Sequence, residues 1–323
     1  LLSLGSWVGG DMDGNPFVTP EVFAEALGLQ YCALLRLYKA DMELLAPALS
    51  LAGNFLKPDP DFDAALGCML EEMAQAGLDT AMYRQQVGRE PIRLMANLMV
   101  RKLAHTALAP PLEPTSRRRP FAYGDVEEFR GELALLARRL EDNGFGRTAR
   151  LRVGELLTKT RLFGFHFVSL DLREDAQNVA AAARWITRAL GLSRDSVGEE
   201  AYLQALDAEI LSPKTVLPRQ LLGGEVDEGG DAEEAAFVRR LLGVLTVARK
   251  SKPTMGPLAA RNLILSMTQS AEDMLNALLL LKTEGLFYQD MHGRYRSEMD
   301  LVPLFETIGD LRAAPHVMDT LLS

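Results

Sequence analysis

Apolar residues recur at spacings of three and four positions over most of the chain, which is the pattern of amphipathic helices. Polar capping residues precede several of these stretches, and glycine follows others, as at the ends of helices. The stretch 80–107 contains Gly88 and Pro91, which predict a break within it. The predicted helices cover residues 19–50, 64–76, 80–107, 126–143, 151–161, 175–190, 199–211, 232–249, 270–283 and 308–322.

Four shorter runs, at 1–8, 163–172, 262–268 and 301–305, have the apolar and β-branched or aromatic composition of buried strands. In the second run, aromatic residues alternate with smaller ones, which favours a strand over a helix. Most of these strands precede a predicted helix, and that alternation is typical of a parallel sheet. The pattern therefore predicts a helix-dominated α/β fold, part of a (β/α)8 barrel with many additional helices.

No repeat of fixed period and no low-complexity tract divides the sequence, so residues 1–323 are predicted to form a single domain. Two stretches are predicted to be surface loops. Residues 109–120 are rich in proline and contain three consecutive arginines, and residues 212–231 contain several glycines and prolines. The arginines are interpreted as a solvated loop, with a phosphate contact as the less favoured alternative.

The composition is that of a soluble globular protein, with 48% apolar and 24% charged residues in a chain of 323. The net charge of −9 argues against nucleic acid as the main partner, because phosphate binding needs a basic surface. Cys32 and Cys68 lie in apolar helical patterns and are interpreted as reduced core residues of a cytoplasmic protein. The longest apolar runs are too short to cross a bilayer. Because the sequence begins without methionine inside a predicted strand, we expect an internal fragment of a longer protein.

The first candidate site follows the first predicted strand. Trp7 precedes two glycines, Gly9 and Gly10, and two carboxylates, Asp11 and Asp13, before the next helix begins. A glycine-rich turn of this kind brings backbone N–H groups, short acids and an aromatic ring to the carboxyl end of a strand, where α/β folds hold their chemistry. The alternative, which these residues alone favour, is a tight structural turn.

Two further strands also end in charged residues. Asp171 and Arg173 leave the strand 163–172 on the same side, and an arginine there can bind a phosphate or carboxylate through two N–H groups. The strand 301–305 delivers Glu306, whose carboxylate suits a hard divalent cation. The alternative for Asp171 and Arg173 is a simple Asp–Arg pair, and the alternative for Glu306 is a cap of the following helix. His166 is interpreted as a packed, hydrogen-bonded histidine within its strand and not as a catalyst.

Three segments, SWVGGDMDGNP (6–16), GFHFVSLDLRED (164–175) and LVPLFETIGDL (301–311), resemble motifs of the phosphoenolpyruvate carboxylase family and occur in the family's order. The segment LSMTQS (265–270) resembles a strand and helix cap of the same family, and we interpret it as scaffold with no titratable group directed at the site. The resemblance covers essentially the whole chain.

The sequence departs from the family's pattern at a few positions. Val8 replaces methionine, and Met12 replaces the usual arginine, which removes a cation from between two carboxylates. Glu174, Asp175 and Ala176 replace Gln-Glu-Ser, so that the residues after Arg173 are more acidic than in the family.

The resemblance implies that bicarbonate carboxylates phosphoenolpyruvate to oxaloacetate and phosphate, with Mg²⁺ or Mn²⁺ as the cofactor. This lyase reaction is anaplerotic carbon dioxide fixation that feeds the tricarboxylic acid cycle, and the parent enzyme is expected to be a cytosolic homotetramer. The resemblance also implies the roles of individual residues. Trp7 and Leu304 line the apolar pocket for the CO₂-like intermediate, and Arg173 binds the substrate phosphate. Glu306 is a metal ligand, and three further residues contribute to substrate binding: Gly9, Gly10 and Asp11.

Other family motifs are absent from the sequence. No segment resembles the one with the catalytic histidine, the one with the second metal-binding aspartate, or the glycine-rich loop with further arginines. We therefore expect the chain to be inactive alone. One alternative is a non-catalytic relative of the same fold that binds an anionic metabolite or acts as a scaffold. Another phosphoenolpyruvate-utilising barrel enzyme is a third possibility, although it should not contain all three motifs.

Overall fold

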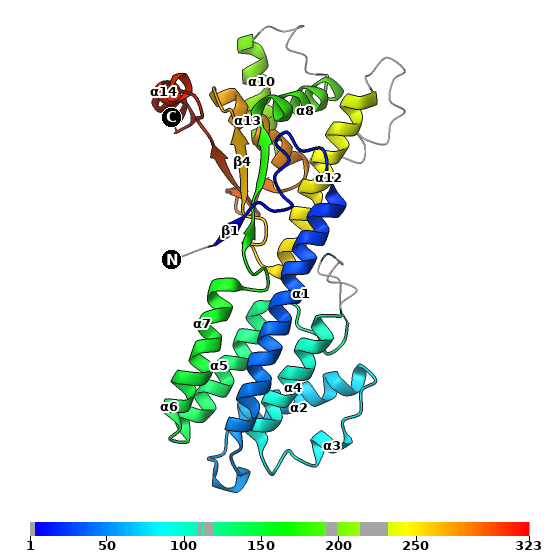
Figure 1. Ribbon diagram of the computed structural model, residues 1–323, viewed down its shortest axis with the longest axis vertical. Helices are drawn as coiled ribbons and strands as arrows, with labels where there is room; N and C mark the ends of the chain where they lie inside the picture. Colours follow the sequence, from blue (N-terminus) through cyan, green and yellow to red (C-terminus); the bar gives the residue numbers. More distant parts are fainter. Residues whose placement is uncertain (1–3, 109–111, 113–118, 192–198, 214–231, 323) are drawn as a thin grey trace. The chain divides into compact units, whose positions relative to one another are not determined.

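The structure is a computed structural model that describes residues 4–108, 112, 119–191, 199–213 and 232–322 (Figure 1). The chain divides into two compact units. The helical unit comprises residues 27–168 and 250–259, and the sheet unit comprises residues 4–26, 169–249 and 260–323. Whether the whole chain forms one domain, as the sequence predicts, stays a prediction.

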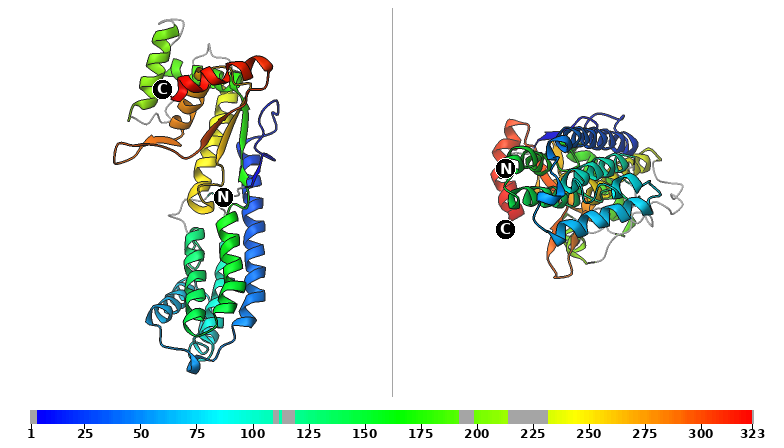
Figure 2. Two further views of the ribbon diagram at one scale, coloured as in Figure 1. Left: turned by 90° about the vertical axis from the view of Figure 1, so that its left-hand side faces the viewer. Right: turned by 90° about the horizontal axis from the view of Figure 1, so that it is seen from below.

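The helical unit is formed by helices that lie side by side, among them α4, α5 and α7 (Figure 2). Capping residues fix where two of these helices begin: Asp59 accepts a hydrogen bond from Phe62 N, and Asp125 accepts one from Glu128 N. Pro91 opens α4, so the predicted break in 80–107 is confirmed. The elements are α1 (Pro20–Leu45, which begins in the sheet unit), short 3₁₀ turns (Ala46–Leu49 and Gly53–Phe55), α2 (Pro60–Gln75), α3 (Ala81–Arg84), α4 (Pro91–Thr106), α5 (Val126–Asp142), α6 (Gly146–Thr148), a π-helical turn (Ala149–Val153) and α7 (Gly154–Phe163).

Phe165 lies in an aromatic core within the helical unit. Its ring is 6.1 Å from that of Tyr31, 6.3 Å from those of Tyr38 and Phe129, and 6.4 Å from that of Tyr123. The Tyr38 hydroxyl donates a 2.9 Å hydrogen bond to the carbonyl of Gly164, which fixes the start of the turn that carries Phe165. Edge-to-face and tilted arrangements of this kind stabilise a core beyond the area that they bury.

This core explains why the predicted strand 163–172 is wrong over its first half. Phe163 ends α7, and Gly164 and Phe167 have φ values of +52° and +69°, which a strand does not allow. The alternation of aromatic residues arises because the turn directs Phe165 into the aromatic core while leaving Phe167 partly exposed. Strand structure begins only at Ser169.

His166 lies in this turn, not in a strand, and is buried, as expected for a packed histidine. Burial lowers its pKa to about 4, and the positive charges of Arg130 and Lys252 act in the same direction, against a hydrogen bond with the Met255 backbone. In the described part of the chain its Nδ1 atom has no hydrogen-bond partner. The imidazole is therefore neutral in the folded state at neutral pH.

We expect His166 to make the helical unit less stable in acid. Because its folded-state pKa lies below the unfolded value of 6.5, the unfolded state takes up a proton first, and stability is lost as the pH falls from 6.5 towards 4. From pH 7 to pH 5 the loss should be about 2 kcal/mol. Urea unfolding of the wild type and of His166→Gln, followed by circular dichroism at both pH values, measures the difference. An equal pH dependence in both proteins would show that the histidine does not contribute.

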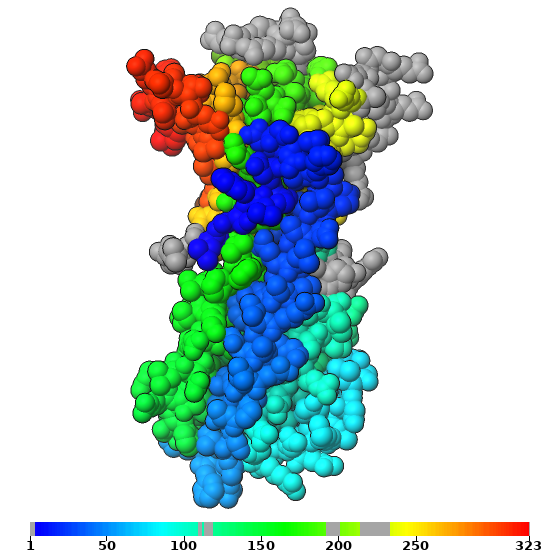
Figure 3. All heavy atoms as spheres, in the orientation of Figure 1, coloured from blue at the N-terminus to red at the C-terminus, as the bar shows by residue number. Residues whose placement is uncertain are grey.

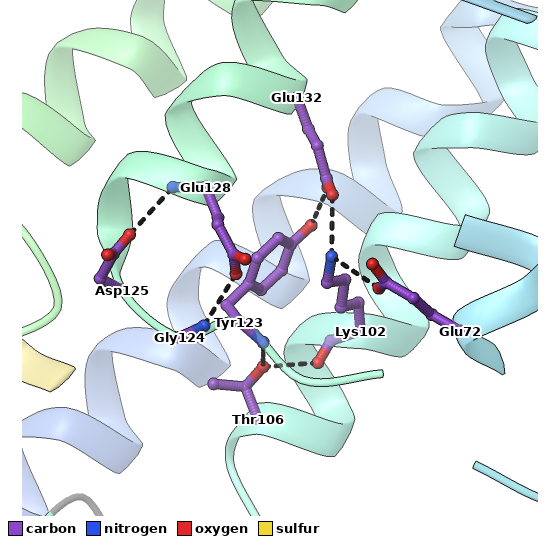
Figure 4. Close-up of polar contacts among 8 residues, drawn as sticks. All are labelled: Glu72, Lys102, Thr106, Tyr123, Gly124, Asp125, Glu128 and Glu132. Atoms are coloured by element: carbon purple, nitrogen blue, oxygen red, sulfur yellow. Dashed lines mark hydrogen bonds and ion pairs between the residues drawn. The ribbon is translucent and has the colours of Figure 1, made fainter. Parts of the chain in front are cut away.

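A buried polar network joins three helices of the helical unit (Figure 4). Lys102 on α4 contacts Glu132 on α5 at 3.0 Å and Glu72 on α2 at 3.1 Å. The Tyr123 hydroxyl donates a 2.5 Å hydrogen bond to Glu132, and the Tyr123 backbone N–H donates one to the hydroxyl of Thr106. The side chains of Lys102 and Glu132 are 5% and 16% exposed, so the network holds a charged pair largely away from solvent.

The sheet unit contains a parallel sheet with the strand order β3-β4-β7 and a two-stranded parallel pair, β1-β2. The bridge between Asp11 and Arg173 extends the contact of the N-terminal segment along β3. The elements are β1 (Gly5–Ser6), β2 (Ser169–Leu170), β3 (Leu172–Asp175), α8 (Ala176–Ala189), α10 (Glu199–Leu211), α12 (Ala232–Met255, which ends in the helical unit), β4 (Asn262–Ser266), α13 (Ala271–Thr283), β5 (Phe287–Gln289), β6 (Tyr295–Ser297), β7 (Asp300–Pro303) and α14 (Ile308–Leu322).

Each strand of the three-stranded sheet leads into a helix, which confirms a helix-dominated α/β architecture with small parallel sheets. The predicted cap at Ser270 is confirmed: Ser270 forms a capping box with Asp273 before α13. Asp175, which was predicted to lie in the helix itself, instead caps α8 by accepting a hydrogen bond from Gln177 N. The antiparallel hairpin β5-β6, in which the rings of Phe287 and Tyr295 stack at 5.7 Å, was not predicted.

Other predictions about the surface have mixed outcomes. Both cysteines are free thiols, but Cys68 is exposed, so its assignment to the core is wrong; it lies on the solvent face of α2. Most of the predicted loops 109–120 and 212–231 lies outside the described residues. None of the helices that the structure describes has the length and apolar character needed to cross a membrane.

Candidate functional site

Residues from three strands of the sheet unit, or directly after them, meet at the side chain of Arg173. The arginine lies on β3, Trp7 directly follows β1, and Glu306 follows β7. Arg173 Nη2 is 3.4 Å from Glu306 Oε1, and the centre of the guanidinium is 5.8 Å from the Trp7 ring. The structure therefore brings together the indole, the guanidinium and the carboxylate that the sequence places at separate strand ends.

The two glycines of the N-terminal turn allow it to lie directly on β3. Gly9 has φ of +92°, and a Cβ atom on Gly10 would lie 2.3 Å from the backbone oxygen of Asp171. Arg173 N donates a hydrogen bond to the Gly10 carbonyl, and Met12 N donates one to the Arg173 carbonyl. In the space-filling view the N-terminal segment, in dark blue, covers part of the green segment that contains β3 (Figure 3). The turn thus fixes the backbone on both sides of Arg173.

Three carboxylates surround the guanidinium of Arg173. Asp13 Oδ2 is 3.1 Å from Nη2, Glu306 Oε1 is 3.4 Å from Nη2, and Asp11 Oδ2 is 3.9 Å from Nη1. Asp11 Oδ1 is buried and has no hydrogen-bond partner among the described residues. One positive charge therefore faces three negative ones, so the cluster has an excess of negative charge.

Met12, which occupies the position of the family's usual arginine, is 2% exposed, so its side chain packs in the interior. The guanidinium that contacts both Asp11 and Asp13 is supplied by Arg173, from a different strand. Met12 contacts β3 through the hydrogen bond from its backbone N–H to the Arg173 carbonyl. Although position 12 has no cation, Asp11 and Asp13 therefore still form ion pairs, both with Arg173.

Asp171 does not face the arginine but joins neighbouring strands. Its Oδ1 atom accepts hydrogen bonds from Ser169 Oγ and Asn262 Nδ2, both at 2.9 Å. Burial raises the pKa of Asp171, against the opposing effect of these two hydrogen bonds. We interpret Asp171 as a structural residue beneath the glycine turn.

Leu304 and Glu306 leave β7 next to β4. Leu304 N donates a hydrogen bond to the Leu265 carbonyl, and its own carbonyl accepts one from Thr268 N. The helix that follows is capped by Thr307 and Asp310, each of which accepts a hydrogen bond from the backbone N–H of the other. The alternative role of Glu306 as a helix cap is therefore wrong, and its carboxylate is available at the strand end.

Glu306 alone offers limited support for a metal ion. The described residues contain no group of three or more histidine, cysteine or carboxylate side chains arranged to hold one. Mg²⁺, however, is commonly bound by one or two carboxylates together with water and substrate phosphate oxygens. The partly exposed carboxylate of Glu306 fits that second kind of site.

Ser266 is a site residue that the sequence analysis missed, because the segment 265–270 was interpreted as scaffold. Its hydroxyl accepts a 2.7 Å hydrogen bond from Arg173 Nε, and the residue is fully buried. The only signal in the sequence was its place near the end of the predicted strand 262–268.

Comparison with known proteins assigns the chain to a family. The family model described as phosphoenolpyruvate carboxylase matches residues 1–323. The chain belongs to this family. It is 35% identical over 330 residues to the phosphoenolpyruvate carboxylase of Rhodopseudomonas palustris strain BisA53, covering 100% of this chain and 32% of that protein.

Other curated phosphoenolpyruvate carboxylases show a similar relation. The protein of Aromatoleum aromaticum is 33% identical over 328 residues, with 100% of this chain and 33% of the relative covered. That of Bradyrhizobium diazoefficiens is 32% identical over 332 residues, with coverage of 100% and 32%. The chain thus spans about a third of the length of the relatives that it matches.

Proposed function

We propose that this chain is the part of a phosphoenolpyruvate carboxylase that binds the substrate phosphate, within an enzyme that converts phosphoenolpyruvate and bicarbonate to oxaloacetate and phosphate. The observation that supports this most directly is the meeting of Arg173, on β3, with Trp7 and Glu306, which follow the carboxyl ends of β1 and β7. Sites of α/β folds lie at such ends. Membership of the family supplies the reaction.

In this proposal Arg173 binds the phosphoryl group. A guanidinium fixed in place stabilises negative charge on the phosphoryl oxygens without having to reorganise during the reaction. Trp7 lies beside the guanidinium and is 53% exposed in this chain; in the full-length enzyme it would, together with Leu304, exclude water from the carbon that gains the carboxyl group. Water exclusion matters here because a proton donor would quench the enolate before it attacks CO₂. Gly9 and Gly10 let the turn pack closely against its neighbours, and this turn, with Asp11, would line the substrate site.

Glu306 would hold the Mg²⁺ or Mn²⁺ ion of the enzyme. When bound, the metal supplies Lewis-acid stabilisation of negative charge on a substrate oxygen. Asp11 and Asp13, which also contact Arg173, keep the guanidinium in place and contribute to the negative potential that attracts a cation.

The full-length enzyme is further proposed to place β3, β4 and β7 in a (β/α)8 barrel, because each of these parallel strands leads into a helix. We also propose a cytosolic homotetramer whose oxaloacetate feeds the tricarboxylic acid cycle. The 323-residue chain is expected to be inactive alone, since it spans about a third of its relatives.

The test is oxaloacetate formation by the full-length polypeptide that contains these residues. Phosphoenolpyruvate, bicarbonate and Mg²⁺ are supplied, and oxaloacetate is followed by NADH oxidation through malate dehydrogenase. We expect turnover by the full-length protein and none by residues 1–323. A folded full-length protein that binds phosphoenolpyruvate without turnover would instead support a non-catalytic metabolite-binding relative.

A further inference from the structure

We propose that Ser266 is a positioning residue for Arg173: its buried hydroxyl fixes the Nε edge of the guanidinium and so leaves Nη1 free for a ligand oxygen. The nature of that ligand, the phosphate of phosphoenolpyruvate, rests on the proposed function. The orientation of the guanidinium does not, because it follows from contacts within this chain.

The strand register places the two residues on one face of the sheet. Arg173 on β3 lies opposite Ile264 on β4, and Ser266 is two residues further along β4. Residues two apart in a strand point to the same face, and diagonal neighbours on adjacent strands lie within reach of a long side chain. The 2.7 Å hydrogen bond from Nε to Ser266 Oγ is therefore fixed by the pairing of the strands.

The five N–H groups of the guanidinium are used unequally. Nε donates to Ser266, and Nη2 faces Asp13 at 3.1 Å and Glu306 at 3.4 Å. Nη1 is 3.9 Å from Asp11, which is too far for a hydrogen bond. Among the contacts that the structure describes, the N–H groups of Nη1 are those left for an incoming anion.

A serine hydroxyl suits this role because it is neutral. A carboxylate that bound both Nε and Nη2 would form a two-pronged ion pair and neutralise the charge that the ligand needs. Three carboxylates, those of Asp11, Asp13 and Glu306, lie close enough to compete for such a pair. Because Nε donates to Ser266, none of these carboxylates can bind Nε and Nη2 together. The guanidinium therefore retains positive charge and free N–H donors for the ligand.

The hydroxyl is also protected from competing water. Ser266 is 0% exposed, whereas the Arg173 side chain is 24% exposed. The buried end of the arginine is therefore anchored and its outer end is accessible, as a binding side chain requires. Loss of the hydroxyl would leave a charged N–H donor without its buried acceptor, which is unfavourable.

The experiment compares Ser266→Ala with Ser266→Thr, which keeps a hydroxyl, and with Thr268→Val. Thr268 is a matched control, because its buried hydroxyl donates to the Leu265 carbonyl and belongs to the same turn. The direct readout is the ¹⁵N–¹H signal of Arg173 Nε in the arginine-labelled 323-residue chain, assigned by its loss in Arg173→Lys. We expect this signal to shift in Ser266→Ala and to stay in place in Thr268→Val.

The second readout is steady-state kinetics of the full-length enzyme. Ser266→Ala should raise KM for phosphoenolpyruvate roughly 10-fold, with a smaller change in kcat, and Ser266→Thr should restore it. An unchanged Nε signal in Ser266→Ala would overturn the proposal, and so would a shifted signal with unchanged KM. If Ser266→Ala does not fold, Ser266→Cys, whose sulfur is a weaker acceptor, gives the same Nε readout.

Failure of the proposed function has a different signature. In that case the wild-type full-length protein forms no oxaloacetate, while the Nε signal in the 323-residue chain still responds to Ser266→Ala. Titration of the chain with inorganic phosphate then decides the proposal. A phosphate-dependent shift of the Nη1 signals that is weakened in Ser266→Ala supports the positioning role, and equal shifts in both proteins contradict it.

Discussion

Replacing Arg173 by glutamine is expected to lower kcat/KM for phosphoenolpyruvate in the full-length enzyme by about 10²–10³, the usual cost of removing a fixed donor to developing negative charge. Lysine should not restore the activity, because a single ammonium cannot bind Ser266, Asp13 and a ligand oxygen in the geometry of the guanidinium. The effect should appear in kcat as well as KM, since charge on the phosphoryl oxygens changes during the reaction.

Arg261→Gln is the matched control for this substitution. Arg261 immediately precedes β4 in the same unit, and its Nε atom pairs with Asp300 at 2.7 Å, but both side chains are about half exposed. Removing this surface pair should leave kcat/KM almost unchanged. Because Arg173→Gln leaves Asp11, Asp13 and Glu306 without their shared cation, thermal unfolding of each variant must accompany the kinetics. A folded Arg173→Gln enzyme with wild-type kcat/KM would contradict the role of Arg173.

The place of Arg173 could be predicted because parallel strands share a carboxyl edge. Runs of apolar residues that end in a glycine turn, an arginine or a glutamate, each followed by a helix, indicate such an edge without knowledge of the strand register. Trp7, Arg173 and Glu306 accordingly lie together, although more than 130 residues separate Arg173 from Glu306.

The sequence could not predict contacts that depend on register or on backbone turns. Ser266 resembles any serine at a strand end until the pairing of β3 with β4 places it beside Arg173. Phe165 and Phe167 have the spacing of a strand, but positive φ values at Gly164 and Phe167 form a turn around an aromatic core instead. In both cases tertiary packing overrides the local pattern.

The second large effect is expected in the helical unit, where Lys102→Met should lower the free energy of unfolding by about 3–5 kcal/mol. The substitution removes the cation that contacts Glu132 and Glu72 while leaving Glu132 buried beside the Tyr123 hydroxyl. Burial already raises the pKa of Glu132, against the opposing influence of Lys102. Without the lysine, the folded state must hold either an unpaired charge or a bound proton.

Urea unfolding at pH 7, followed by far-ultraviolet circular dichroism, measures this loss. The two tryptophans, Trp7 and Trp185, both belong to the sheet unit, so their fluorescence reports separately on that unit. Lys159→Met is the matched control, because Lys159 also contacts two carboxylates, Asp41 and Glu155, but is 38% exposed. Replacing Lys159 should lower the free energy of unfolding by no more than about 1 kcal/mol.

A double variant separates the cost of an unpaired charge from the worth of the pair itself. Lys102→Met combined with Glu132→Leu removes both charges, and replacing a whole buried ion pair by apolar residues is often neutral or stabilising. We therefore expect the double variant to be more stable than Lys102→Met alone, although the Tyr123 hydroxyl then loses its acceptor. Equal stability of the single and double variants would mean that the loss of stability in Lys102→Met does not come from the isolated Glu132 carboxylate. Lys102 would then stabilise the unit mainly through the packing of its aliphatic stem and through the contact of its ammonium group with the Tyr123 ring, 4.7 Å away.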